Sequence, residues 1–167
     1  MTDVDTLVIR VATVSDADAL ARLRYSWRVN ERGERGMNEP SFDAALADWI
    51  VKHESTHVPF LAERLGEPIG MAWLALVDRV PGPQNFIRQS AYIQSVYVIA
   101  SERSCGIGSL LMKFVVEYGR TLGLDYLAVH PSERAFSLYR RLGFVETDRV
   151  LELRSLEMNI SHRSFHT

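Results

Sequence analysis

The sequence holds a single cysteine, Cys105, among its 167 residues. No internal disulfide can form, and a chain without disulfides fits a reducing compartment. The sequence also lacks any apolar run near the 18 or more residues that a membrane-spanning helix needs. Its first ten residues, "MTDVDTLVIR", contain two aspartates and no basic region ahead of an apolar core, so we expect no signal peptide. These absences together predict a cytoplasmic protein.

Positive charge is not in excess either, since 19 lysines and arginines stand against 21 aspartates and glutamates, for a net charge of −2. This balance gives no indication of a nucleic-acid or membrane partner. Internal repeats and low-complexity tracts are absent. Apolar residues make up 47% of the chain and charged residues 24%, which is typical of a globular protein. The length predicts one domain, spanning residues 1–167, that buries about 70% of its unfolded surface.

Apolar periodicity and turn residues divide the chain into alternating elements. Helices are expected after Ser15, after Ser41, over 109–122 and over 133–142, where Ser15 and Ser41 act as N-terminal caps. Two strands in the middle of the chain are separated by the turn "GEP" and predict an antiparallel pair. Strands are expected at 6–12, 58–65, 69–77, 91–99, 125–130, 144–148 and 150–160. The order of elements predicts an α/β fold with one β-α-β unit at 91–130.

The stretch "KHESTHVPF" contains His53 and His57 in the letter pattern H-E-x-x-H of zinc metalloproteases. Such a site needs both histidines one turn apart on a helix that continues past the second. Here Pro59 disfavours helix in the residue before it, and a predicted strand begins at once. The extended zinc pattern would also need glycine and histidine where Phe60 and Glu63 stand. We therefore expect no metal site and interpret His53 as a helix-end residue beside the last carbonyl groups.

Another stretch, "VYVIASERSCGIGSLL", places a predicted strand, a short loop and a helix start in that order. The first N–H groups of a helix have no intrahelical partner, and the helix dipole adds about half a positive charge there. Gly106 and Gly108 would let the backbone approach a phosphate closely, and Arg103 can add charge-assisted hydrogen bonds. The stretch lacks the Gly-Lys-Ser/Thr of a P-loop and the third glycine of a dinucleotide-binding loop. It predicts an anion site, and a tight turn without a ligand is the alternative.

About thirty residues later the chain reads "SERAFSLYRRLGF". This stretch resembles the C-terminal helix of the GNAT (Gcn5-related) N-acetyltransferase family. The earlier stretch "SERSCGIGSLL" is similar to the acetyl-CoA segment of the same family, whose pattern is Gln/Arg-x-x-Gly-x-Gly/Ala. The resemblance extends in element order from about residue 6 to 160. It implies a mixed, mostly antiparallel central sheet of about seven strands with about four helices, and strands that splay apart at the cofactor site.

The resemblance also implies acetyl-CoA as co-substrate, with no metal. The pyrophosphate would lie on the N–H groups of residues 104–109, and the pantetheine arm would pair with the strand at 96–98 beside a bulge near Ser95–Tyr97. Cys105 would contribute only its backbone, and Ser132 stands where the family often has asparagine. The implied cofactor-binding residues are Val96, Tyr97, Val98, Arg103, Ser104, Cys105, Gly106, Ile107, Gly108, Ser109 and Ser132.

Tyr139 falls where the family places a hydroxyl near the thioester sulfur, so the resemblance implies a catalytic role for it. Its place on the apolar stripe of its helix also allows a plain core role. His130 and Glu63 are candidates for the base that deprotonates the acceptor amine, and a solvated or structural role is the alternative for both. Gln94 stands on the strand where many relatives carry an acid, and an amide cannot act as a base.

The acceptor pocket of the family is lined by the loop before the fourth strand, here "DRVPGPQNFIRQ", and by the first two helices with their connection. That region holds Trp27 and an arginine patch, which fits a carboxylate or phosphate on the acceptor or, alternatively, a solvated helix face. The patch consists of Arg24, Arg28, Arg32 and Arg35. We therefore predict an N-acetyltransferase for a primary amine of a small molecule or peptide. A non-catalytic acyl-CoA-binding regulatory module is the alternative, and a zinc hydrolase is disfavoured. Dimers are common in the family, and an exposed last strand would allow a homodimer.

Overall fold

The computed structural model describes residues 6–153, which form a mixed five-stranded sheet in the order β1-β2-β3-β4-β5. Strands β1 to β4 form three antiparallel pairs between neighbours in sequence, and β5 joins β4 in parallel, as the predicted β-α-β unit requires. The strands are β1 (Leu7–Val11), β2 (His57–Arg64), β3 (Glu67–Asp78), β4 (Gln89–Val98) and β5 (Leu127–Val129).

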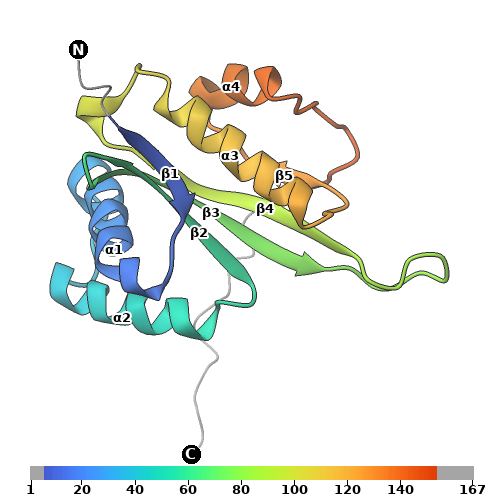
Figure 1. Ribbon diagram of the computed structural model, residues 1–167, viewed down its shortest axis with the longest axis horizontal. Coiled ribbons are helices and arrows are strands. Elements are labelled where there is room, and N and C mark those ends of the chain that lie inside the picture. The colour runs from blue at the N-terminus through green and yellow to red at the C-terminus, as the bar shows by residue number, and fades with distance from the viewer. Residues whose placement is uncertain (1–5, 154–167) are drawn as a thin grey trace, which may run out of the picture.

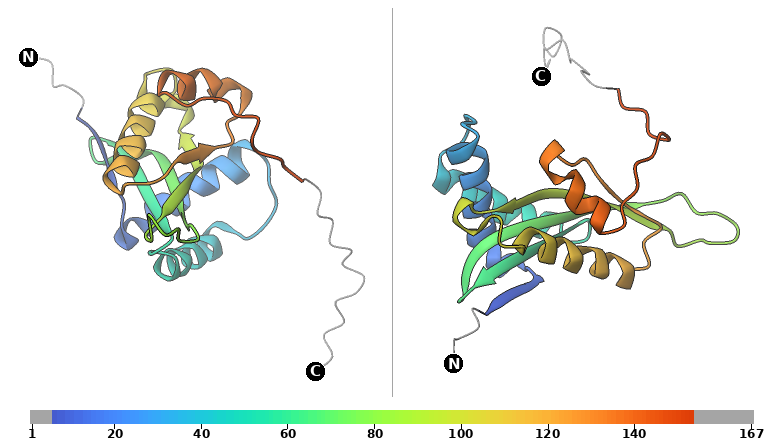
Figure 2. Two further views of the ribbon diagram at one scale, coloured as in Figure 1. Left: turned by 90° about the vertical axis from the view of Figure 1, so that its right-hand side faces the viewer. Right: turned by 90° about the horizontal axis from the view of Figure 1, so that it is seen from above.

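Helices cover both faces of this sheet (Figure 1). One face carries α1 (Ala17–Tyr25) and α2 (Glu39–Lys52), and the other carries α3 (Ile107–Thr121) and α4 (Phe136–Arg141). A π-helical segment, Ser26–Glu31, continues α1 toward the loop before α2. Within residues 6–153 no helix is both long enough and apolar enough to cross a bilayer. The result is a three-layer α/β arrangement, seen from two further directions in Figure 2.

Side-chain alternation along the strands divides the core into two main layers. Leu61 on β2 packs with α1 and α2, whereas its neighbour Phe60 packs with α3. On the α3 side, Leu111 and Met112 are fully buried against the sheet. Each strand of the sheet interior therefore contributes to both layers, and this explains why β2 to β4 read as nearly continuous apolar runs.

Both helix caps differ from the sequence expectation. Thr13, not Ser15, forms a capping box with Asp16 before the first helical turn. The second helix begins at Glu39, where the Asn38 side chain accepts a hydrogen bond from the backbone N–H of Ser41 at 3.0 Å. Ser41 therefore lies inside the first turn of α2. Each region offers two capping residues two or three positions apart, and the apolar pattern alone does not rank them.

The predicted count of about seven strands is too high for the described residues, which contain five. Residues 144–148, predicted as a strand, form neither helix nor strand. The same holds for 150–153 at the start of the predicted last strand, and 154–160 lie outside the described residues. The apolar residues of these segments do not pack on the sheet, since Val145 and Leu151 are exposed, and the segments pair with none of the described strands. The dimer surface suggested for the last strand is therefore not formed by described residues.

Replacing Leu111 by alanine is expected to lower the free energy of unfolding by about 2–5 kcal/mol, because the fully buried side chain would leave a cavity between α3 and the sheet. Leu110→Ala is the matched control: the neighbouring leucine on the same helix is 48% exposed, and its replacement should change the free energy by about 0.5 kcal/mol or less. Urea unfolding measures both. Equal losses would contradict this packing of α3.

Candidate active site

A β-bulge interrupts β4 at the centre of the molecule. Gln94 lies opposite Trp73 and Tyr97 lies opposite Met71, so two residues of β4 face the single residue Ala72 of β3. Ser95 takes up the extra length with a φ of 54°, in the left-handed region that a serine rarely adopts. The bulge expected near Ser95–Tyr97 is thus confirmed.

The bulge changes which backbone groups of β4 point toward β5. Before it, the carbonyl of Gln89 and the N–H of Ala91 bond to residues leading into β5. After it, the N–H of Ile99 donates to the carbonyl oxygen of Ile69 in β3, so the alternation has shifted by one residue. The backbone N–H and C=O groups of Val96 and Val98 consequently point to the β5 side.

No described strand occupies that side of β4 beyond the last β4–β5 pair, Ile93 with Val129. β5 is three residues long and ends at that level, whereas β4 continues to Val98. Pairing between the two strands thus ends at this level and leaves a short open edge at residues 96–98, in the region where the resemblance implies splayed strands. This edge can accept an extended ligand as an added strand.

The turn that follows β4 leads into α3 through two residues with positive φ, Ser104 at 62° and Gly106 at 79°. Gly106 is the N-cap and no side chain caps the helix, so the first N–H groups of α3 have no intrahelical partner. Ile107 is buried against Ala62 and Ile69, which fixes the turn on the sheet. Cys105 is exposed, with its Sγ 3.5 Å from the carbonyl oxygen of Arg103. The turn thus has the geometry of an anion site.

Arg103 has protein partners on both sides of its guanidinium. Its Nε donates to the carbonyl oxygen of Val98 at 2.9 Å, and its Nη2 donates to the carboxylate of Glu31 at 2.7 Å. The hydroxyl of Tyr97 donates to the same carboxylate at 2.6 Å. These bonds, from Tyr97 first and then Arg103, lower the pKa of Glu31. Burial, followed by the bond to Glu31, raises the pKa of Tyr97. The cluster ties the π-helical segment to β4 and to the turn.

Tyr139 is 5% exposed and lies on the α3 side of the sheet, in the same apolar cluster as Val96. Its hydroxyl donates to Met112 Sδ at 3.6 Å, and a thioether is a weak acceptor. Burial raises the pKa of Tyr139 to about 12. A buried phenol usually has a better partner than this. Tyr139 therefore carries a protonated hydroxyl whose hydrogen-bond partner is a weak acceptor, inside the apolar cluster that Val96 of β4 packs against.

The other predicted side chains are placed differently. His130 follows β5 directly, is exposed, and stacks on Tyr92 with ring centroids 6.4 Å apart. Ser132 opens the short 3₁₀ turn before α4, and its side chain makes no capping bond. Glu63 forms two 2.9 Å hydrogen bonds with Arg10 at the β1–β2 edge, two strands away from β4. This ion pair fits the structural alternative for Glu63.

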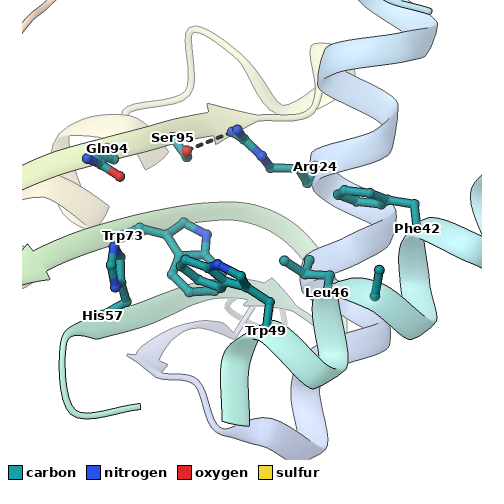
Figure 3. A pocket seen from close by; sticks show the side chains of 9 residues that line it. Arg24, Phe42, Leu46, Trp49, His57, Trp73, Gln94 and Ser95 are labelled. Atoms are coloured by element: carbon teal, nitrogen blue, oxygen red, sulfur yellow. Dashed lines mark hydrogen bonds between the residues drawn. The ribbon is translucent and has the colours of Figure 1, made fainter. Parts of the chain in front are cut away.

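A pocket of about 330 Å³ lies on the opposite face of the sheet, under α1 and α2 (Figure 3). Gln94 and Ser95, consecutive residues, both line it, which only the bulge makes possible. Its walls are Phe42, Ala45, Leu46, Trp49, His57 and Trp73. The pocket and the open edge of β4 therefore meet at the bulge, each from its own side. The sequence pattern does not single out Phe42, Trp49 and Trp73, whose large rings form part of this wall.

The two histidines of "HESTH" belong to this aromatic group. α2 ends at Lys52 and β2 begins at His57, so the histidines do not share a helix. His53 stacks on Trp49 with centroids 4.1 Å apart, and a ring nitrogen of His53 lies 2.8 Å from the Trp49 carbonyl oxygen. Burial, followed by the nearby His53, lowers the pKa of His57. Among residues 6–153 no group of three or more potential ligands could hold a metal ion.

Comparison with known proteins agrees with this architecture. The model of the acetyltransferase (GNAT) family matches residues 20–144, well over half of the chain. No protein with a curated description matches. Among solved structures, a predicted acetyltransferase from Clostridium acetobutylicum with acetyl-CoA superposes with a TM-score of 0.73 at 23% identity, over 92% of this chain and 99% of that one.

Two further structures have the same fold. A GCN5-related N-acetyltransferase from Ralstonia eutropha gives a TM-score of 0.67 at 22% identity, covering 89% of this chain and 98% of its own. Glucosamine-6-phosphate N-acetyltransferase from Arabidopsis thaliana gives 0.67 at 16% identity, covering 89% and 97%. At such identities the likeness concerns the fold, whereas the family model concerns the sequence itself. The chain belongs to the GNAT family of acetyltransferases.

Proposed function

We propose that the protein is an N-acetyltransferase that transfers the acetyl group of acetyl-CoA directly to a primary amine of a small molecule or peptide. One observation carries the proposal: the open edge of β4 and the pocket under α2 meet at a single bulge. An acyl donor on one side and an amine on the other would come together there. The acetyl-CoA in the Clostridium acetobutylicum structure supports the choice of donor.

The diphosphate of the donor would bind the turn at residues 104–109. The free N–H groups at the start of α3 and the positive end of its dipole favour an anion. Gly106 places no Cβ in the way. Because Arg103 is held by Glu31 and Val98, it would contribute to this site mainly as a nearby positive charge, unless its Glu31 bond opens.

The pantetheine arm would lie along the open edge, where its amides can pair with the backbone groups of Val96 and Val98. This direction carries the thioester from the turn toward the bulge. The side chain of Tyr97 faces the other layer, among α1 and α2, so it would not contact the arm. The backbone of residues 96–98 thus does the binding, and the side chains position the strand.

The acceptor amine would enter through the pocket and attack the thioester carbon. A C–N bond forms, the C–S bond breaks, and the amine loses a proton. An amine with a pKa near 10.4 must first give up a proton, at a cost of about 4.6 kcal/mol at pH 7. His130, beside the strand separation, or an ordered water would accept it.

Tyr139 would stabilise the departing thiolate by hydrogen bonding. With a pKa of about 12, against about 8.5 for a simple thiol, complete proton transfer from Tyr139 is uphill by about 5 kcal/mol. A hydrogen bond to developing negative charge needs no such transfer. The weak bond to Met112 can be given up at little cost.

Tyr139→Phe is expected to lower kcat by about 100-fold while leaving coenzyme A affinity and folding stability nearly unchanged, since only the hydroxyl is removed. Tyr118→Phe is the matched control, a second tyrosine packed against the same apolar cluster. Steady-state kinetics with thiol release as readout measures both variants. If Tyr139→Phe turns over substrate as fast as the parent protein, the role of Tyr139 is structural, as part of the apolar core.

Gly106→Ala is expected to weaken coenzyme A binding by about 10-fold and to lower stability by about 1 kcal/mol, because alanine is strained at a φ of 79° and the turn would shift. Gly123→Ala, at the other end of α3 with a φ of 65°, introduces the same strain away from the turn. Calorimetry should find lower affinity only for the first variant. Equal affinities would argue against diphosphate binding at residues 104–109.

The function itself is tested by incubating the protein with acetyl-CoA and a panel of primary amines, with thiol release and product mass as readouts. Acetylation of at least one amine, abolished without protein, is the expected result. The proposal fails if coenzyme A and acetyl-CoA do not bind at millimolar concentration.

A further inference from the structure

Arg24 differs from the neighbouring arginines in what it contacts. It is half-buried on α1, and its Nη1 donates to Ser95 Oγ at 2.7 Å (Figure 3). No described carboxylate pairs with it, whereas Arg28, one turn later, pairs with Glu34 at 2.8 Å. Burial is the main cause that lowers the pKa of Arg24, because the charged guanidinium has lost water. A half-buried cation without a carboxylate partner is a favourable place for an anion.

The pocket around Arg24 carries no opposing charge. None of the described residues that line it is acidic. His57 has a lowered pKa and is therefore neutral near pH 7, so Arg24 supplies the only positive charge of the lining. The rest of the wall is made of Phe42, Leu46, Trp49 and Trp73. A cation above apolar rings fits a ligand with an anionic end and a bulky apolar part.

The position of Arg24 fixes where the anionic end would lie relative to the reaction. Its guanidinium bonds to Ser95, the bulge residue itself, so a carboxylate on Arg24 lies next to the point where amine and thioester meet. Amine and carboxylate must then be close together in the acceptor, as they are on one carbon of an α-amino acid. A peptide N-terminus has no carboxylate at that distance.

We propose that the acceptor is a free α-amino acid with a large apolar side chain. Its carboxylate binds Arg24, its α-amine faces the bulge at Ser95, and its side chain packs on Trp49 and Trp73 (Figure 3). This assignment rests on the proposed acetyl transfer and names the acceptor of that same site. Polyamines are disfavoured because they would bring positive charge to Arg24, and amino sugars because most of the lining is apolar and would leave several of their hydroxyl groups without hydrogen-bond partners.

Matched acceptors test the role of the carboxylate. L-tryptophan and L-phenylalanine should be acetylated with a kcat/KM at least about 100-fold above that of tryptamine and phenethylamine, which lack only the carboxylate. L-glutamate should be a poor acceptor because its side chain is charged. Glucosamine 6-phosphate tests whether the anion site accepts a phosphate on a polar acceptor instead.

Variants then connect this preference to one residue. Arg24→Met should reduce the preference for L-tryptophan over tryptamine to within about 5-fold, mainly through KM for the amino acid, and should leave coenzyme A affinity unchanged. Arg24→Lys should be intermediate, since lysine keeps the charge but not the paired hydrogen bonds. Arg28→Met is the control, because Arg28 lies on the same helical segment but does not line the pocket. Thermal melting verifies that each variant is folded.

The outcomes separate this inference from the proposed function. Carboxylate preference that depends on Arg24 supports both. Acetylation of tryptamine, phenethylamine or glucosamine 6-phosphate at least as efficiently as the amino acids overturns the inference while retaining the acetyl transfer. If coenzyme A binds but no α-amino acid is acetylated or bound in calorimetry, the inference also fails. Absence of coenzyme A binding removes the proposed function itself.

Discussion

The extra residue in β4 is the constraint on which the rest of the site depends. Without it, Ser95 would point to the α3 layer, and only Gln94 of this pair would reach the pocket. The same residue shifts the backbone alternation, so that Val96 and Val98 face the open edge rather than β3. Ser95 holds this geometry with an unfavourable φ, and its hydroxyl accepts the hydrogen bond from Arg24. This bulge thus directs the backbone groups of Val96 and Val98 to the open edge of β4 and the side chains of Gln94 and Ser95 into the pocket.

The helical layers on the two faces of the sheet contribute different parts of the candidate site. The α3 layer contains the turn at Gly106, which follows β4, and Tyr139, which lies in the apolar cluster that Val96 packs against. The α1–α2 layer presents a charged residue and a set of rings around a pocket. The cluster of Glu31, Tyr97 and Arg103 connects these layers through charge-assisted hydrogen bonds. Because these hydrogen bonds join the π-helical segment to β4 and to the turn, they hold the turn and the pocket side of the molecule together.

The sequence predicts the parts of this picture that repeat along the chain or match a family pattern. Strands β1 to β5, the helix at Gly106 and the bulge follow from periodicity and from the resemblance. The sequence points to Ser15 and Ser41 as caps, whereas Thr13 and Asn38 take that role, because residues of similar capping ability stand close together in both regions. The strand at 144–148 does not form, since apolar letters do not specify a pairing partner. The resemblance implies a pocket at the first two helices, but its aromatic lining escaped prediction, because periodicity places Trp49 on an inner face without saying how closely that face is packed.

An open strand edge is also a hazard, because a strand of another molecule can add to it and begin aggregation. Here the open edge is short, because it comprises only residues 96–98 at the end of β4. Arg103 shortens it further by occupying the carbonyl oxygen of Val98 and by placing a charge at its end. The charge of the guanidinium therefore discourages the pairing of a second polypeptide with this edge.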